Sequence, residues 1–305
     1  MKYSFTRFPL KLLCASLLMA ALLFSGAIAQ DEGVDKANQA KESFNTAIES
    51  VQKGDTATAI SLYKGALELD NTLVDAHMNL GSIYFAQKKY KEAEGSFKAY
   101  TDAKPSDPIG FINLGKLYSV QKKITNAQAA YEGALAADEN YAEAQKELGK
   151  LYYSAKKYDD CIGAMEKYTA KTDDYYALYL LGAAHGKKKS YNKAIESYKK
   201  ALAVKANHFE SLRNMGKIYS KKENFSKAVS YYKKALKAKP KDYKTAYNLA
   251  ISVQSIDPED YDACIAQWQK FLKLARKVPK AKKYIASTEE LIKSLKEAKV
   301  VASEQ

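Results

Sequence analysis

The segment "NLGSIYFAQKKY", residues 79–90, determines the fold because the chain repeats it four more times. The further copies begin at Asn113, Glu147, Leu180 and Asn214, so consecutive starts are 34, 34, 33 and 34 residues apart. Self-similarity at a fixed period of this length is the sequence signature of stacked structural repeats. The sequence therefore predicts a repeat architecture.

The composition of the whole chain favours helices. Of its 305 residues 47% are hydrophobic and 28% are charged, which excludes the class of disordered, highly charged chains. Only 14 glycines and 6 prolines are present, too few for an all-β protein with many tight turns. Alanine, leucine, lysine and glutamate, which are good helix formers, are abundant. The sequence predicts an all-α fold.

Each repeat has two halves that both show helical spacing. The first half carries Leu-Gly-x-x-Tyr, as in Leu80, Gly81 and Tyr84, with the two large residues on one helical face. The second half follows a short basic turn and places small and aromatic residues on one face, as in Ala93 and Phe97. Glycine inside a helix costs about 1 kcal/mol relative to alanine. Its recurrence predicts a close approach of the two helices, with Gly81 facing Ala93.

These positions resemble the tetratricopeptide repeat, a helix–turn–helix unit of 34 residues. The resemblance implies a right-handed superhelical solenoid whose neighbouring repeats stack, since a single unit cannot bury its apolar face alone. It covers an array over residues 40–278, and the residues after it, 279–305, are expected to form a C-terminal capping helix. The seven predicted repeats are 40–73, 74–107, 108–141, 142–174, 175–208, 209–242 and 243–278.

The N-terminus has the pattern of an export signal. Residues 1–29 combine three basic residues and no acid with an apolar run from Leu12 that ends in Ala-Ile-Ala. This order is typical of a secretory signal peptide cleaved after Ala29, and an uncleaved membrane anchor is the alternative. The sequence therefore predicts an exported protein, periplasmic or secreted, or one anchored with its array outside the cytoplasm. Residues 30–39 are predicted to be a flexible segment.

No catalytic or cofactor motif occurs in the chain. The glycine-rich nucleotide loops, the nucleophile elbow and the zinc-protease helix are all absent, and His77, His185 and His208 are isolated in sequence. Cys161 and Cys264 occupy the small-residue position of a second helix, three repeats apart, too far for a disulfide. The sequence predicts a protein that is not an enzyme, with no cofactor and no metal, and with two buried free thiols.

The candidate binding site is the groove that the resemblance places along the first helices. There the sixth position of a repeat is often an asparagine that hydrogen-bonds a ligand's backbone. Basic residues at the fifth and ninth positions give a groove that favours an acidic protein or peptide ligand. The known clamp for a C-terminal carboxylate is not reproduced, because Met78 and Ser82 replace its first lysine and asparagine. The predicted groove residues are Asn79, Asn113, Asn214, Asn248, Lys116, Lys146, Lys150, Arg213 and Lys217.

A second surface comes from the turns between the paired helices, which carry runs of lysine along one edge. These runs are Lys88-Lys89, Lys122-Lys123, Lys156-Lys157, Lys187 to Lys189 and Lys221-Lys222. Solvation of the turns explains such runs, and contact with anionic envelope material is the sharper alternative. Export makes nucleic acid a poor partner. The sequence therefore predicts a non-catalytic scaffold that binds a protein or peptide, and the alternative is an electrostatic adaptor that uses this lysine-rich edge.

Overall fold

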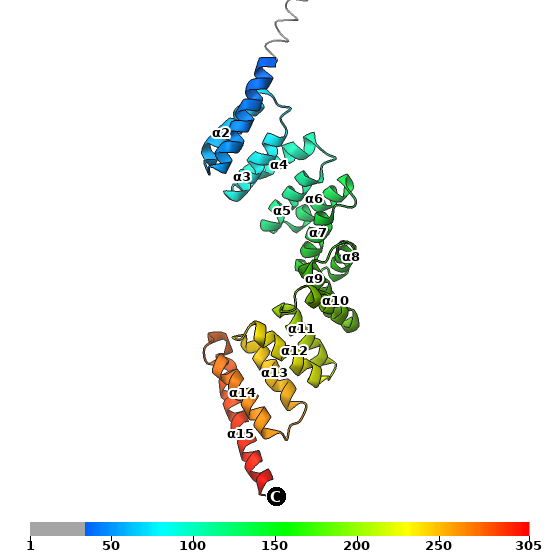
Figure 1. The fold of residues 1–305 in the computed structure, drawn as a ribbon, viewed down its shortest axis with the longest axis vertical. Coiled ribbons are helices and arrows are strands. Elements are labelled where there is room, and N and C mark those ends of the chain that lie inside the picture. The colour runs from blue at the N-terminus through cyan, green and yellow to red at the C-terminus, as the bar shows by residue number, and fades with distance from the viewer. Residues whose placement is uncertain (1–33, 305) are drawn as a thin grey trace, which may run out of the picture. The chain divides into compact units, whose positions relative to one another are not determined.

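The computed structural model describes residues 34–304, and these residues form helices and turns without any strand (Figure 1). The predicted signal segment, residues 1–29, lies outside the described residues. The first helix spans residues 34–52. The elements after it are α2 (Thr56–Leu69), α3 (Asp75–Ala86), α4 (Tyr90–Ala103), α5 (Pro108–Val120), α6 (Ile124–Ala137), α7 (Ala142–Ser154), α8 (Tyr158–Thr169), α9 (Tyr175–Lys187), α10 (Tyr191–Val204), α11 (Phe209–Lys221), α12 (Phe225–Ala238), α13 (Tyr243–Gln254), α14 (Tyr261–Ala275), the 3-10 helix η1 (Pro279–Tyr284) and α15 (Ile285–Ser303).

The helices form consecutive pairs, as the repeat period predicts. From α3 to α13, each first helix begins within one residue of the start of a predicted repeat. Side-chain caps fix several of these starts; for example, Asp107 accepts a hydrogen bond from the amide of Ile109 before Pro108 opens α5. The first pair differs from the prediction, because residues 34–39 are helical and extend the helix into the segment expected to be flexible. Good helix formers such as Lys36 and Ala37 explain this extension.

The chain divides into two compact units, Met1–Tyr141 and Ala142–Gln305. Each unit is a stack of helix pairs in which every pair contacts its neighbours. The sequence predicts one array, whereas the division falls at the predicted boundary between the repeats that end at 141 and begin at 142. Because a repeat contacts only adjacent repeats, a solenoid has no single core that would join its two halves.

The recurrent glycine packs against a large side chain of the second helix. The alanine predicted to face it also lies close in one repeat, where a Cβ atom on Gly182 would be 3.1 Å from the carbonyl oxygen of Ala194. A Cβ atom on Gly81 would lie 2.5 Å from the ring of Phe97. The same contact recurs sixteen residues after each of the other four glycines, in the pairs Gly115–Tyr131, Gly149–Met165, Gly182–Tyr198 and Gly216–Tyr232. Ala93 is fully buried as expected, but the ring one turn further along lies directly over the glycine.

The turn inside each pair contains one residue in the left-handed region of backbone conformation. Gly54 takes this position in the first pair, with φ of 80°. Lysine takes it in the next four, at Lys88, Lys122, Lys156 and Lys189, with φ between 60° and 62°, and Glu223 follows in the next. A residue with a Cβ is strained in this region, where glycine is preferred.

The last pair is covered by η1 and α15, as the predicted capping helix requires. Trp268 and Phe271 of α14 pack in one apolar cluster with Ile292 and Leu295 of α15. Cys161 and Cys264 are both free and fully buried, as the sequence predicts. None of the helices in residues 34–304 is long and apolar enough to cross a lipid bilayer.

Candidate protein-binding groove

The four predicted asparagines lie on the first helices of their repeats, as the repeat frame requires. Asn79 is on α3, Asn113 on α5, Asn214 on α11 and Asn248 on α13. All four are partly buried. The first two belong to one compact unit and the last two to the other, so the row is described separately in each unit.

Two of these asparagines form a hydrogen bond with the hydroxyl of a tyrosine in the preceding repeat. Asn214 donates a hydrogen bond from Nδ2 to the hydroxyl of Tyr198, at 3.1 Å. Asn79 likewise makes a side-chain hydrogen bond to Tyr63. The corresponding residue for Asn113 is Phe97, which has no hydroxyl, and Asn113 points its Nδ2 to the sulfur of Met78 instead, at 3.1 Å. At Asn79 and Asn214 the asparagine therefore also has an intramolecular role.

The same relationship explains why the row is interrupted. Leu180 stands at the asparagine position in α9, and the preceding helix offers Met165, with which it shares an apolar cluster. Glu147 stands there in α7 and forms an ion pair with Lys150, with Nζ and Oε1 2.7 Å apart. At Leu180 the apolar residue of the sixth position therefore matches the apolar side chain beneath it.

The predicted basic residues divide into those with acidic partners and those without. Lys146 forms an ion pair with Asp174, 2.6 Å from Nζ to Oδ2, and this hydrogen bond raises the pKa of Lys146. Lys150 is paired with Glu147, and Lys116 is a partly buried residue that already interacts within the fold. Arg213 and Lys217 differ from them, since neither forms an ion pair with a carboxylate in the described part of the chain.

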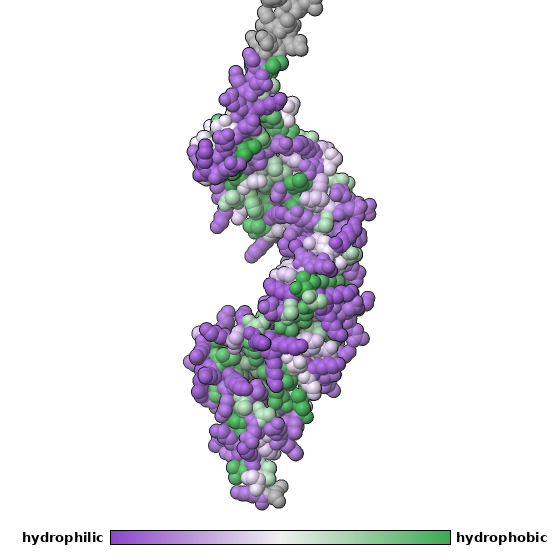
Figure 2. All heavy atoms as spheres, in the orientation of Figure 1, coloured by the Kyte–Doolittle hydropathy of each residue, from purple (hydrophilic) through white to green (hydrophobic). Residues whose placement is uncertain are grey.

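Arg213, Asn214 and Lys217 line a cleft of about 350 Å³ on the first helices of the second unit. It lies where α7, α9 and α11 are neighbours. Figure 2 shows apolar residues at the position that α9 occupies in Figure 1, with hydrophilic side chains around them. We call this cleft of about 350 Å³ the α11 cleft. Its lining residues are Tyr153, Tyr179, Ala183, Gly186, Lys187, Tyr191, Tyr198, Arg213, Asn214, Lys217, Ile218 and Lys221.

The charge in the α11 cleft is entirely positive. Lys187, Arg213, Lys217 and Lys221 line it, no carboxylate does, and none of the four forms an ion pair within residues 34–304. The Nε atom of Arg213 is buried and has no hydrogen-bond partner in the structure. Lys217 reaches the surface, yet surrounding protein atoms desolvate its ammonium group and, with the nearby charge of Arg213, lower its pKa. An anion placed here would relieve both costs.

Tyrosines form the rest of the cleft, and the sequence did not single them out as site residues. Tyr179 is partly buried against Tyr198, with ring centroids 6.1 Å apart, and burial raises the pKa of both hydroxyl groups. Lys221 lies over the ring of Tyr191, 6.0 Å from its centroid. Tyr153 and Tyr179 are first-helix residues at positions that vary between repeats, which is the signal that could have identified them. The cleft therefore offers both cationic groups and aromatic surface to one ligand.

The remaining polar groups of interest are explained by packing. His185 is buried at the position of a core tyrosine, and this burial lowers its pKa. His208 is buried beside Ser211, with Nδ1 and Oγ 2.8 Å apart, and contacts Tyr175 and Tyr179 edge-on. Burial raises the pKa of the Cys161 thiol to about 12, which keeps it protonated. No group of His, Cys, Asp and Glu residues able to hold a metal ion occurs in the described ranges.

Comparisons with known proteins agree with this architecture. Family models described as tetratricopeptide repeat match residues 50–110, 112–175 and 173–241. A comparison with curated proteins finds no match.

Solved structures provide similar folds. The C-terminal part of a TPR repeat-containing protein from Cytophaga hutchinsonii is 21% identical, with a TM-score of 0.65, over 79% of this chain and 98% of that one. The MamA protein is 22% identical, with a TM-score of 0.53, over 56% and 92% of the two chains. YrrB, described as a TPR protein with an unusual peptide-binding site, is 24% identical, with a TM-score of 0.51, over 62% and 95%.

Identities of this size establish a shared fold, and the family models add the sequence positions that define the repeat. Together those models match more than half of the chain. They agree with the period, the paired helices and the glycine contacts described above. Tetratricopeptide repeats generally form non-enzymatic scaffolds for protein–protein interaction. The chain belongs to the tetratricopeptide repeat family.

Proposed function

We propose that the chain is a non-catalytic scaffold of the cell envelope or secreted space that binds an acidic protein or peptide segment in the α11 cleft. The observation that carries this proposal is the set of four cations, Lys187, Arg213, Lys217 and Lys221, which share one cleft without a carboxylate. Like charges held together in a partly desolvated site repel one another, and an anionic ligand removes that repulsion.

The tyrosines and Asn214 give the site a means of holding a peptide beyond its charge. Asn214 donates one N–H to Tyr198 and also bonds the hydroxyl of Tyr179, so its amide oxygen is the group that can accept a hydrogen bond from a ligand backbone. The rings of Tyr153 and Tyr179 supply apolar surface for a side chain next to the acidic group. YrrB, a protein of similar fold, is described as having a peptide-binding site, which supports this class of ligand. The basic, apolar and small-residue order of residues 1–29 supports the envelope or secreted location.

The test is a capture experiment from an envelope extract of the source organism, using the wild-type chain and a Lys187/Lys217/Lys221→Gln variant. The matched control is Lys193/Lys199/Lys237→Gln, which removes three exposed lysines from α10 and α12 in the same unit. A discrete protein captured by the wild type and by the control, and lost with the cleft variant, supports the proposal. Equal capture by all three chains refutes the role of the α11 cleft.

The cleft lysines are better probes than the asparagines. Replacing Asn79, Asn113 and Asn214 together also removes the hydrogen bonds to Tyr63 and Tyr198. A loss of binding would then be confused with a loss of stability. The three lysine side chains are exposed and unpaired, so their replacement leaves the packing of the helices unchanged.

A second candidate function is the electrostatic adaptor, in which the lysine-rich turns bind anionic envelope material. The observation that favours it is the strain at Lys88, Lys122, Lys156 and Lys189. Their side chains form no hydrogen bond or ion pair within residues 34–304, so nothing in the fold offsets that strain. Binding of this kind weakens steeply with ionic strength and is lost on replacing these four lysines by glutamine, while the α11 cleft variant keeps it.

A further inference from the structure

Two more clefts flank α14 near the C-terminal end of the second unit. One, of about 540 Å³, lies between α12, α13 and α14, and the other, of about 560 Å³, lies between α14 and α15. Lys273 lines both of them, so we treat them as one surface and call it the α14 surface. The first cleft is lined by Lys233, Leu236, Pro240, Ala246, Leu249, Gln267, Lys270, Lys273 and Leu274, and the second by Gln269, Leu272, Lys273, Arg276, Lys277, Glu289 and Ile292.

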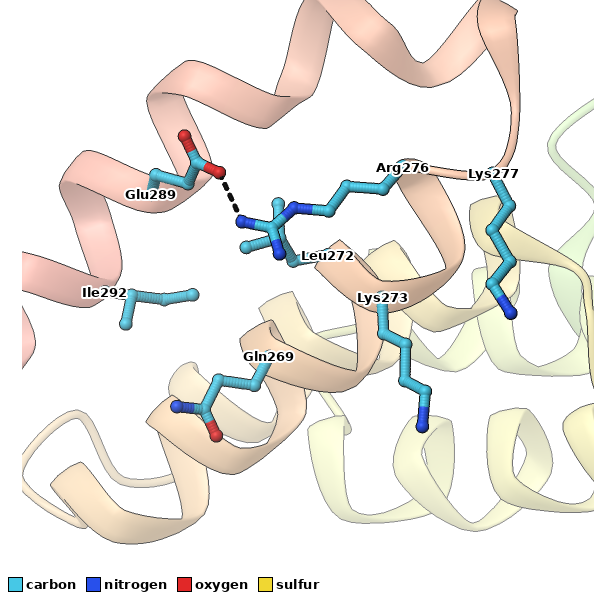
Figure 3. Close-up of a pocket in the computed structure, with 7 residues that line it drawn as sticks. All are labelled: Gln269, Leu272, Lys273, Arg276, Lys277, Glu289 and Ile292. Carbon is cyan, nitrogen blue, oxygen red and sulfur yellow. Dashed lines mark hydrogen bonds and ion pairs between the residues drawn. The ribbon is translucent and has the colours of Figure 1, made fainter.

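The α14 surface combines aliphatic floors with a rim of lysines. Leu236, Leu249 and Leu274 lie in the first cleft, and Leu272 and Ile292 in the second. Its charged groups are of one sign except for Glu289, which is already bonded to Arg276, 2.6 Å from Oε1 to Nη2. In Figure 3 the side chain of Arg276 reaches across to Glu289, whereas Lys273 and Lys277 extend in another direction, away from that carboxylate.

The lysines of this rim have no acidic partner of their own. Lys233, Lys270, Lys273 and Lys277 are exposed and form no ion pair in the described part of the chain. Lys270 and Lys273 share one face of α14, and Lys277 follows in the turn after it. The sequence around them lacks acids over long stretches, since residues 225–241 and 263–288 contain thirteen lysines or arginines and no aspartate or glutamate. The surface is therefore complementary to an extended negative charge.

The shape of the surface favours lipid over a partner helix. A helix is about 10 Å across and needs a continuous groove, whereas α14 with Lys273 separates the two clefts. The free cations are lysines, which act as mobile point charges, and the arginine that could bind a carboxylate with two hydrogen bonds is already occupied. Point charges around short aliphatic clefts match phosphate head groups with the upper part of their acyl chains below them.

We propose that the α14 surface docks the second unit on a membrane that contains anionic phospholipid. The rim lysines contact the head groups, and the two aliphatic clefts cover the glycerol and acyl segments next to them. This surface uses different residues from the α11 cleft, so a bound protein partner and the membrane do not compete for the same side chains. Failure of one proposal leaves the other standing.

The test is co-sedimentation of the full chain with vesicles of phosphatidylcholine alone and of phosphatidylcholine with phosphatidylglycerol. The neutral vesicles measure any insertion by the apolar residues 12–29, and the difference between the two vesicles measures docking on anionic lipid. Each lysine near an anionic surface contributes about a fivefold change in affinity, so Lys233/Lys270/Lys273→Gln should weaken the difference on the order of a hundredfold. Inorganic phosphate at matched ionic strength should not displace the wild type.

The matched control is Lys91/Lys193/Lys199→Gln, which removes the same charge from exposed lysines on α4 and α10 that belong to neither proposed site. The proposal predicts that this control binds as the wild type does and that both variants keep the wild-type melting temperature. It is overturned by wild-type binding that does not depend on phosphatidylglycerol, by equal losses in the two variants, or by a loss confined to the control. Displacement by inorganic phosphate would overturn the lipid as the ligand, since a free anion would then fill the site.

Discussion

Gly115 lies directly beneath the ring of Tyr131, so closely that a Cβ atom on the glycine would be 2.3 Å from Cε1 of that ring. Both residues are buried in the contact between α5 and α6. The ring occupies the space that any other residue at position 115 would need. This pair therefore sets the distance between the two helices of the repeat.

Replacing Gly115 by alanine should destabilise the first unit by about 1–3 kcal/mol, because the ring of Tyr131 must move in a packed core. Gly115→Leu should cost more, since its longer side chain displaces the ring further. The measurement is thermal or urea unfolding followed by circular dichroism. Gly95→Ala is the control, since Gly95 lies inside α4 with no atom within 4 Å of an added Cβ, and it should stabilise by up to about 1 kcal/mol. An unchanged midpoint for Gly115→Ala would contradict the contact.

Replacing Lys88 by glycine should stabilise the fold, by about 0.5–1 kcal/mol, because Lys88 has φ of 60° and glycine accepts this conformation without strain. Gly54 shows that the first helix pair already uses glycine there. The neighbouring Lys89 has φ of −82°, so Lys89→Gly should destabilise by adding freedom to the unfolded chain. Urea unfolding of the two variants should thus give shifts of opposite sign, and shifts of the same sign would be evidence against strain at Lys88.

The hydrogen bond between Asn214 and Tyr198 should appear as a coupling in a double-mutant cycle. Asn214→Ala and Tyr198→Phe should each cost about 1 kcal/mol, and the double variant should cost less than their sum by a similar amount. The comparison is the cycle of Asn113→Ala with Phe97→Leu, where the second helix supplies no hydroxyl and the coupling through a hydrogen bond is absent. Additive effects at Asn214 and Tyr198 would contradict a stabilising hydrogen bond between them.

Lys217 should make stability depend on pH at the alkaline side. Its pKa in the folded chain is lowered, so the folded state releases this proton at a lower pH than the unfolded state, whose lysine pKa is about 10.4. The unpaired cation destabilises the fold at neutral pH, and this penalty is relieved as pH rises through the lowered pKa. Lys217→Gln should therefore be more stable than the wild type at about pH 7, with a difference that shrinks toward about pH 10. Urea midpoints across this range measure it, and a constant difference would contradict the lowered pKa.

Much of the fold follows from the sequence because a repeat is specified locally. The Leu-Gly-x-x-Tyr and aromatic-small patterns recur at a fixed period, and helix starts such as Pro108 and Phe209 follow from that period and local capping. The buried state of Cys161 and Cys264 was predictable for the same reason, since both stand where alanine stands in other repeats. These features need only the residues within one repeat.

What the sequence did not reveal depends on contacts between side chains of different helices. The sequence predicted that Gly81 faces Ala93 but did not show that the ring of Phe97 covers the glycine, because ring orientation depends on packing and not on spacing. Ligand binding by the asparagine row stays a prediction, and the sequence did not show that Asn79 and Asn214 also bond tyrosines. Lys146 was predicted to make the groove basic, and the sequence did not show that Asp174, which caps the next helix, pairs with it.

The site itself was predicted only in part for a similar reason. Arg213, Asn214 and Lys217 do line one cleft, but Lys187 and Lys221 were seen only as turn lysines, although they line the same space. Charge counting along the chain does not show which cations have partners. Lys150 is paired because Glu147 stands three residues before it, whereas Asn214 stands three residues before the unpaired Lys217.

The spacing of sixteen residues between each glycine and the side chain that covers it has a consequence for how the chain is assembled. Both members of every such contact belong to one helix pair. The contact can therefore form as soon as that pair has emerged during synthesis or translocation of the chain. Short-range contacts close small loops and form quickly. A chain delivered from one end can therefore be completed pair by pair, with no need to wait for a distant segment.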